Sequence, residues 1–259
     1  MTSRPVRIGV QLQPQHSDYG PYRDAVARAE ELGVDVIFNW DHFYPLYGEP
    51  EGKHFEAWTT LAAWAEQTER AEIGCLVTCN SYRNPELLAD MARTVDHISG
   101  GRLIFGIGSG WFEKDYDEYG YEFGTAGGRL DALGEALPRI ESRWATLNPA
   151  PTRDIPVLIG GGGEKKTLKY VAAHADIWHT FVTGDDLRHK LGVLGGHCEA
   201  IGRDVDEIEV SVGIQGGDLE TARSSYDLGA RLFTYGVGGP DFDLEPLRAL
   251  LAWRDELNG

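Results

Sequence analysis

Four consecutive glycines, Gly160, Gly161, Gly162 and Gly163, lie between an apolar run at 157–159 and a segment with helical character that begins near Glu164. Glycine lets backbone N–H groups approach an anion closely, and the amino terminus of a helix carries a partial positive charge. The alternative interpretation of these four glycines is a flexible turn that binds no ligand. Because ordering four glycines costs backbone entropy, the pattern favours a phosphate-binding loop.

Asp41 and His42 follow another apolar run, at 34–39. Histidine exchanges a proton near neutral pH, and a neighbouring carboxylate can hold a polar group in position. His42 is therefore the candidate acid–base residue, and the alternative is a loop histidine with a structural hydrogen bond. His179 also stands at the end of an apolar run and is a second candidate.

A second glycine-rich turn, GIGSG from Gly106 to Gly110, ends the apolar run at 103–107 and precedes Trp111. Its glycines admit a flat ring or a sugar-like chain close to the backbone, and Ser109 can donate a hydrogen bond. Turns also use glycine for conformational reasons alone, so this motif is weaker by itself.

The segments that must position these residues alternate between strand and helix. Strands are predicted at 7–12, 34–39, 73–78, 103–107, 157–159, 176–181, 208–212 and 231–235, and helices at 22–32, 56–70, 85–99 and 129–147, with long loops at 40–55 and 112–128. Such alternation indicates an α/β fold, either a closed (β/α)₈ barrel or an open doubly wound sheet. Polar loops after several strands, and no GxGxxG after the first, favour one barrel domain over 1–259.

Composition excludes several classes of function. A formal net charge of −17 and the absence of Lys/Arg runs argue against binding to nucleic acid or to an anionic membrane. The three cysteines have no metal-finger spacing, so we predict no metal site and a reducing, cytoplasmic location. No apolar run near the N-terminus is typical of a signal or a membrane span.

Several blocks of sequence together resemble one known family. They read WDHFYP at 40–45, EAWTTLAAWA at 56–65, LVTCNSYRNP at 76–85, GIGSGWFEKDYDEYG at 106–120 and PVLIGGGGEKKTLKYVAAHADIW at 156–178. In type and order they are similar to the luciferase-like monooxygenase superfamily, especially its branch that uses coenzyme F420. The resemblance implies a TIM barrel with a shortened insertion region, and coenzyme F420 as cofactor, with FMN as the alternative.

The resemblance also implies roles for particular residues. By resemblance to related sugar-phosphate dehydrogenases, Asp41 of this chain is expected to contact the cofactor ring, and His42 is expected to lie near the hydride acceptor. The family often has a non-prolyl cis peptide in its third strand, which the alignment places at Cys75-Leu76, within one residue. The cofactor-binding residues expected are Asp41, Cys75, Leu76, Thr78, Asn80, Gly108, Ser109, Gly110, Trp111, Gly160, Gly161, Gly162, Gly163 and Glu164, and the substrate pocket is expected to include Gln11, Gln13, Tyr44 and His179.

Two departures from those dehydrogenases argue against a sugar-phosphate substrate. Trp111 stands where they have a glutamate, and Leu46 where they have a tryptophan. We therefore expect an F420-dependent oxidoreductase that acts on an unidentified small organic molecule. The alternatives are an FMN-dependent monooxygenase supplied by a separate cofactor reductase, and a non-catalytic flavin-binding protein. The resemblance also suggests a homodimer.

Overall fold

Short apolar segments buried on both faces alternate with helices along the chain, as expected for parallel strands covered by crossover helices. The computed structural model describes residues 4–259. The strands are β1 (Arg7–Leu12), β2 (Val36–Asn39), β3 (Glu72–Cys75), β4 (Thr78–Cys79), β5 (Leu103–Gly108), β6 (Val157–Gly160), β7 (Ile177–Thr180), β8 (Glu209–Gly213) and β9 (Ala230–Val237). The α-helices are α1 (Tyr19–Leu32), α2 (Ala57–Gln67), α3 (Pro85–Ser99), α4 (Glu113–Tyr119), α5 (Ala126–Trp144), α6 (Thr167–His174), α7 (Gly184–Ile201), α8 (Leu219–Asp227) and α9 (Leu247–Asn258).

The strands close into a barrel. They pair in the order β3-β2-β1-β9-β8-β7-β6-β5-β4, every pairing is parallel, and a further β3–β5 pairing completes the ring. β3 and β4 share one position of the ring, separated by Leu76 and Val77, and the peptide between these two residues is cis. The predicted (β/α)₈ barrel is confirmed, and the cis bond lies one residue beyond Cys75-Leu76.

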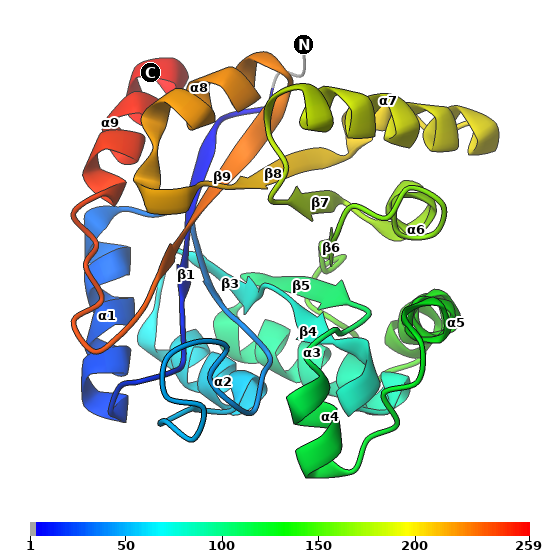
Figure 1. Ribbon diagram of the computed structural model, residues 1–259, viewed down its shortest axis with the longest axis horizontal. Helices are drawn as coiled ribbons and strands as arrows, with labels where there is room; N and C mark the ends of the chain where they lie inside the picture. Colours follow the sequence, from blue (N-terminus) through cyan, green and yellow to red (C-terminus); the bar gives the residue numbers. More distant parts are fainter. Residues whose placement is uncertain (1–3) are drawn as a thin grey trace.

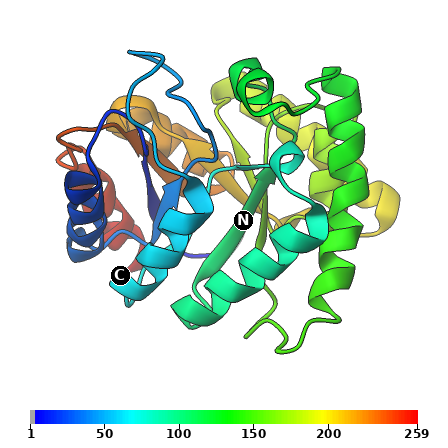
Figure 2. The ribbon, with the colours of Figure 1, turned by 90° about the horizontal axis from the view of Figure 1, so that it is seen from below.

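Helices surround the ring of strands, with α1 and α9 on one side and α5 and α6 on the other (Figure 1). Figure 2 shows α2 and α3 next to each other on the outside of the barrel. Residues 145–156 connect α5 to β6 without a further helix or strand. Among residues 4–259, no helix is both long and apolar enough to cross a bilayer.

Two expectations about local structure were wrong. The loop expected at 112–128 contains α4 and the start of α5, because Asp115 and Tyr116 are buried and hold a short helix against the chain around Cys79. The helix expected near Glu164 begins at Thr167, since residues 164–166 form a turn.

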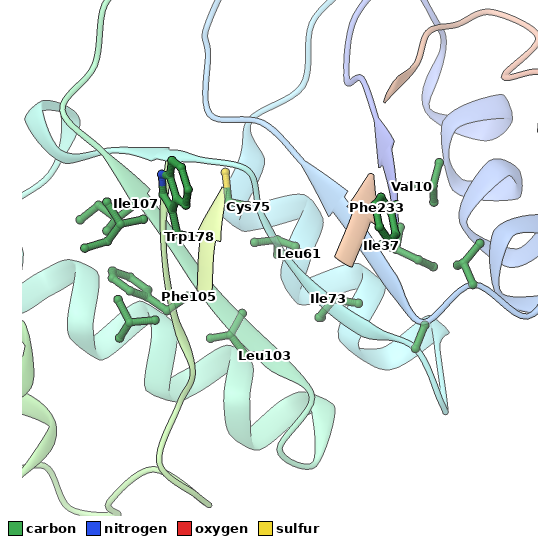
Figure 3. Packing of buried hydrophobic residues seen from close by; sticks show 14 of the residues in the cluster. Val10, Ile37, Leu61, Ile73, Cys75, Leu103, Phe105, Ile107, Trp178 and Phe233 are labelled. Carbon is green, nitrogen blue, oxygen red and sulfur yellow. The ribbon is translucent and has the colours of Figure 1, made fainter. Parts of the chain in front are cut away.

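Alternate strand residues face either the helices or the interior of the barrel. The larger apolar cluster, part of which is drawn in Figure 3, joins outward-facing residues such as Ile37, Phe105 and Trp178 to the helices. A smaller cluster inside the barrel consists of Val36, Phe38, Leu76, Ile104, Leu158, Ile177 and Leu232. At the amino ends of the strands, Arg7 closes the interior by pairing with Glu72 and Glu209. These side chains fill the lower part of the interior, and the larger openings lie at the carboxyl ends.

Candidate active site

The carboxyl ends of the strands open onto a cavity of about 530 Å³. Its walls come from β1, β2, the β3–β4 break, β5, β6 and β7, and from the loops that follow them. The lining residues are Gln11, Trp40, Asp41, His42, Leu46, Leu76, Val77, Thr78, Cys79, Gly108, Ser109, Gly110, Trp111, Gly160, Gly161, Gly162, His179, Thr180, Phe181 and Val182. Most of the residues that the sequence singled out therefore meet at one place, as carboxyl ends of parallel barrel strands must.

Val77 forms part of the floor of this cavity. A Cβ added at Gly108 would lie 2.8 Å from a methyl group of Val77, and one added at Gly160 would lie 3.0 Å from the other. Side chains at these two positions would displace Val77. The glycines thus make room for the side chain after the cis bond, and the flat surface expected at Gly108 is partly covered.

A smaller cavity of about 310 Å³ lies beside the larger one. Gln11, Trp40, Leu76, His179 and Phe181 line both cavities, and β8 and β9 supply the far wall of the smaller one. At the rim of the larger cavity, Trp111 is 62% exposed and Phe181 is 69% exposed. Two large aromatic rings are therefore available to cover a ligand.

His42 is held by a buried carboxylate. Its Nδ1 lies 2.8 Å from Oδ2 of Asp115, which is completely buried. A carboxylate can only accept hydrogen bonds, so Nδ1 carries the proton and donates it to Asp115. Nε2 is consequently the nitrogen of His42 that remains for a ligand. The ring is further fixed by edge contacts with Trp40 and Phe112.

Asp115 accepts three hydrogen bonds besides the one from His42. The N–H groups of Phe43 and Tyr44 each donate to Oδ1 at 3.1 Å, and the hydroxyl of Tyr82 donates to Oδ2 at 2.9 Å. Burial and the adjacent carboxylate raise the pKa of Tyr82, so its hydroxyl stays protonated. Asp115 therefore fastens α4 to the loop that carries His42.

The sequence analysis did not identify this role of Asp115, which stands in a run of charges that reads as a solvated surface. A usable signal was present nearby. Phe112, Tyr116 and Tyr119 recur at helical spacing, and Tyr119 stacks on Phe43 with ring centroids 4.0 Å apart. That stripe predicts a helix with one face turned inward, and Asp115 lies beside the stripe.

Asp41 lines the cavity, but its carboxylate is already engaged. Arg83 donates to both oxygens at 2.6 and 3.0 Å, and the N–H of Cys79 donates to Oδ2 at 3.0 Å. Arg83 also contacts Glu56 at 2.7 Å. Burial lowers the pKa of Arg83, while Asp41 and Glu56 raise it by more, so the guanidinium remains charged. Asp41 thus belongs to a buried ion pair that the sequence did not predict.

The four-glycine loop follows β6 at the edge of the larger cavity. Gly161 has φ +120°, a conformation that side-chain-bearing residues rarely adopt, and its N–H donates to the carbonyl of His179. Within residues 4–259 no hydrogen bond occupies the N–H groups of Gly162 and Gly163. A Cβ added at Gly162 would meet Cε of Lys190 only at 3.9 Å. The loop therefore offers two backbone donors with a lysine nearby.

Glu164 is paired with the lysine that lies near Gly162. Its carboxylate contacts Lys190 at 2.5 Å and His189 at 3.1 Å, and hydrogen bonds from these two side chains are the main causes of its lowered pKa. Lys166 pairs with Asp131. The cation closest to the glycines is therefore Lys190 from α7, which the sequence analysis missed because it lies 28 residues further along the chain.

The remaining predicted residues fall into two groups. Thr78, Ser109 and Gln11 line the larger cavity, and Gln13 lines the smaller one. The others do not line either cavity. Cys75 belongs to the outward-facing apolar cluster, Asn80 is buried in the turn after β4, and the ring of Tyr44 contacts Lys114. Gly163 follows the lining glycines in the loop, and the Glu164 side chain pairs with Lys190. Burial raises the pKa of Cys79 to about 11, which makes its thiol a poor nucleophile.

These residues fit a flavin-type cofactor. A cofactor of this kind needs donors for a phosphate, space for a flat ring and polar atoms at the ring edge. The N–H groups of Gly162 and Gly163 supply the first, the cavity over Val77 supplies the second, and the buried Oγ1 of Thr78, which has no partner within residues 4–259, can supply the third.

Comparisons with known proteins agree with this geometry. An F420-dependent glucose-6-phosphate dehydrogenase of Amycolatopsis mediterranei is 33% identical over 168 residues, which cover 56% of this chain and 49% of that protein. The chain thus spans about half the length of that relative. A protein of the same name from Kineococcus radiotolerans is 27% identical, over 82% of this chain and 68% of its own.

A solved structure of an F420-dependent secondary alcohol dehydrogenase, in complex with an F420-acetone adduct, has a similar fold. The TM-score is 0.80 at 17% identity, over 92% of this chain and 97% of that one. The family described as luciferase-like monooxygenase matches residues 2–216. The chain belongs to the luciferase-like monooxygenase family.

Proposed function

We propose that this protein is a coenzyme F420-dependent oxidoreductase that acts on a small organic substrate. The observation that carries the proposal is the position of His42, which lines the same cavity as the glycine loop and is oriented by a buried carboxylate. F420 is favoured over FMN because the curated relatives described above are named as F420-dependent enzymes.

F420, when bound, would supply or accept a hydride. For oxidation of an alcohol, oxidised F420 would be the acceptor of the carbinol hydride, and the residues of this chain would handle the proton. The hydroxyl proton passes to Nε2 of His42, and the carbon–oxygen bond becomes a carbonyl. In the reverse direction His42 donates that proton. Asp115 keeps Nδ1 protonated and so leaves Nε2 free for this transfer.

The other residues of the site would bind the cofactor and shield the reacting atoms from water. Gly162 and Gly163 would donate backbone hydrogen bonds to the cofactor's phosphate, beside the ion pair of Lys190 and Glu164. Val77 would support one face of the ring. The exposed rings of Trp111 and Phe181 would cover the bound molecules and exclude water.

An FMN-dependent monooxygenase is the second candidate, because the family's description names that activity. It would require a separate reductase to deliver reduced flavin. A non-catalytic flavin-binding protein would use the same loop without His42.

We also propose that the protein is a homodimer and that it is located in the cytoplasm. Light scattering on the purified protein tests the oligomeric state.

The testing experiment is a paired titration of the purified protein with F420 and with FMN, followed by tryptophan fluorescence. Gly162→Asp places a negative charge between the two free N–H groups, and the space around this glycine accepts a side chain. Gly162→Ala is the matched control without the charge. We expect preferential binding of F420, a loss of at least about tenfold in Gly162→Asp, and little change in Gly162→Ala.

The other outcomes are also informative. Preference for FMN would favour the monooxygenase, and binding of neither cofactor would refute the proposed site. Tight binding of F420 without turnover of any alcohol, ketone or enone would favour the non-catalytic protein.

A further inference from the structure

The smaller cavity has its own chemistry, which the cofactor would not use. It lies at the carboxyl ends of β1, β7, β8 and β9, and neither Thr78 nor any of the glycines at 160–163 lines it. Its volume of about 310 Å³ is at the lower end of the range of about 300–1,000 Å³ typical of ligand sites. It shares His179 with the larger cavity, so a molecule in it can reach the proposed cofactor.

Four neighbouring strands turn uncharged polar side chains toward the interior at this level. They are His179 on β7, Ser211 on β8, Thr234 on β9 and Gln11 on β1, and we call them the polar arc. His179 and Ser211 are register partners, whereas Thr234 and Gln11 lie on the next two strands, β9 and β1, and pair with Gly213 and Gly236. The inward positions above Ser211 and Thr234 are these two glycines, where Phe181 and Gln13 of the cavity wall lie close to the backbone.

Two atoms of the polar arc are buried without a partner. Nδ1 of His179 lies 2.8 Å from Oγ of Ser211, but its Nε2 has no hydrogen-bond partner among residues 4–259, and neither has Oγ1 of Thr234. Both side chains are at least 96% buried, and both residues line the smaller cavity. Buried polar groups are nearly always hydrogen-bonded, and these two atoms belong to residues that line an open cavity, where an oxygen of a bound molecule can bond them.

No charged side chain of the described chain, residues 4–259, lines this cavity. Burial lowers the pKa of His179 to about 3, so its imidazole is neutral at physiological pH. The charged groups of the barrel are paired with one another and do not line this cavity. Asp41 pairs with Arg83, and Arg7 pairs with two glutamates at the amino ends of the strands. An anionic group placed here would lose its water without gaining a countercharge.

We propose that the smaller cavity holds the non-reacting part of an uncharged substrate, and that His179 and Thr234 bond a second neutral oxygen on it. The proposal rests on the proposed function, because the reacting oxygen must lie near His42. It identifies the substrate class as alcohols or ketones with an additional hydroxyl, carbonyl or ether oxygen. Phosphorylated and carboxylated substrates are excluded.

Three probes with the same four-carbon skeleton and a secondary alcohol test this class. They are 1,3-butanediol, 2-butanol and 3-hydroxybutyrate, in which the second group is a hydroxyl, absent or a carboxylate. Glucose 6-phosphate is the fourth probe, because curated relatives carry its name. Saturation-transfer NMR measures binding with and without F420, and F420 absorbance measures turnover.

Two variants connect the result to the polar arc. Thr234→Val removes the hydroxyl at nearly constant volume, and His179→Gln keeps a neutral hydrogen-bonding group in case a larger change unfolds the protein. Thr78→Val is the reciprocal control, because Thr78 also has a buried, unpartnered hydroxyl but lines only the larger cavity. It should weaken F420 binding without changing the order of the probes.

We expect 1,3-butanediol to have a kcat/KM at least about tenfold above those of 2-butanol and 3-hydroxybutyrate, with no binding of glucose 6-phosphate. Thr234→Val should remove that advantage and leave F420 affinity unchanged. Equal use of the carboxylate, binding of the phosphate, no advantage for the diol, or no binding of any neutral probe would each overturn the proposal. Failure of F420 to bind would instead refute the proposed function, since the NMR comparison does not require the cofactor.

Discussion

Asp115→Asn tests whether the buried carboxylate decides which nitrogen of His42 carries the proton. The two carboxylate oxygens have separate partners. Oδ1 accepts from the N–H groups of Phe43 and Tyr44, and Oδ2 accepts from His42 and Tyr82. An asparagine can keep its oxygen at the first position, where it retains the loop, and place its NH₂ group at the second.

The consequences differ for activity and for stability. An NH₂ group facing Nδ1 favours the tautomer with the proton on Nε2, which then cannot accept a proton from substrate. We expect turnover to fall by about 10²–10⁴-fold, the usual contribution of a general acid–base group. The hydroxyl of Tyr82 can rotate and accept a hydrogen bond from the new NH₂ group, so the free energy of unfolding should fall by only about 1–2 kcal/mol. Asp115→Ala leaves all four donors without their acceptor and should cost about 3–5 kcal/mol.

Four measurements separate these effects. Nitrogen-15 NMR of the histidine rings reports the tautomer without any substrate, and F420 absorbance reports turnover with the best alcohol available. A fluorescence titration should show unchanged F420 affinity, and urea unfolding gives the stability. Asp117→Asn is the matched control, because Asp117 lies on the same helix and is exposed. It should behave like the wild type.

If the Asp115→Asn variant has an altered His42 tautomer but keeps its turnover within about threefold of wild type, the reasoning is refuted. A double variant supplies a second check. In a His42→Ala background, Asp115→Asn should cause no further loss of turnover, because residues that act as a unit are not additive. An additional loss of the same size would mean that Asp115 acts on something other than His42.

Two further predictions concern stability. Gly106→Ala should destabilise the protein by about 3 kcal/mol or more in urea unfolding, because its Cβ would overlap the backbone carbonyl of Cys75. Gly192→Ala in α7 has open space around it and should stabilise the protein by about 0.5–1 kcal/mol. Equal effects of the two substitutions would contradict this packing. Because the pKa of His179 is lowered to about 3, below 6.5 the unfolded chain binds a proton that the folded protein does not. Stability should therefore be full above pH 6.5 and fall by about 2 kcal/mol between pH 6 and 4.5, and unfolding curves of His179→Gln should lack this part of the decline.

Much of the fold was predictable because its signals are local. The apolar runs that became β1, β5 and β8 are short, and the segments between them have helical periodicity. Asn84 and Pro85 mark the start of α3, where the Asn84 side chain accepts from the N–H of Leu87, and Gly100 ends it at φ +65°. The α4 helix was missed because only one side of its charged sequence is buried.

The candidate site was predictable to the extent that barrel topology brings strand ends together. His42, Thr78, Ser109 and Gly161 come from four different strand ends, and all four line one cavity. Their roles toward the cofactor remain predictions. Asp115, Arg83 and Lys190 were not found, because each acts on a residue at least 26 positions away along the chain.

The sequence by itself determined the alternation of strands and helices, the family, and the glycines and the histidine at the strand ends, because these depend on local periodicity and on motifs of adjacent residues. Tertiary structure decided which charges are buried and what they contact. It placed Asp115 on His42, Arg83 on Asp41, and an uncharged polar arc around a second cavity beside the first. The physical reason is that burial and partnership depend on distances through space, which a chain acquires only when its ring of strands closes.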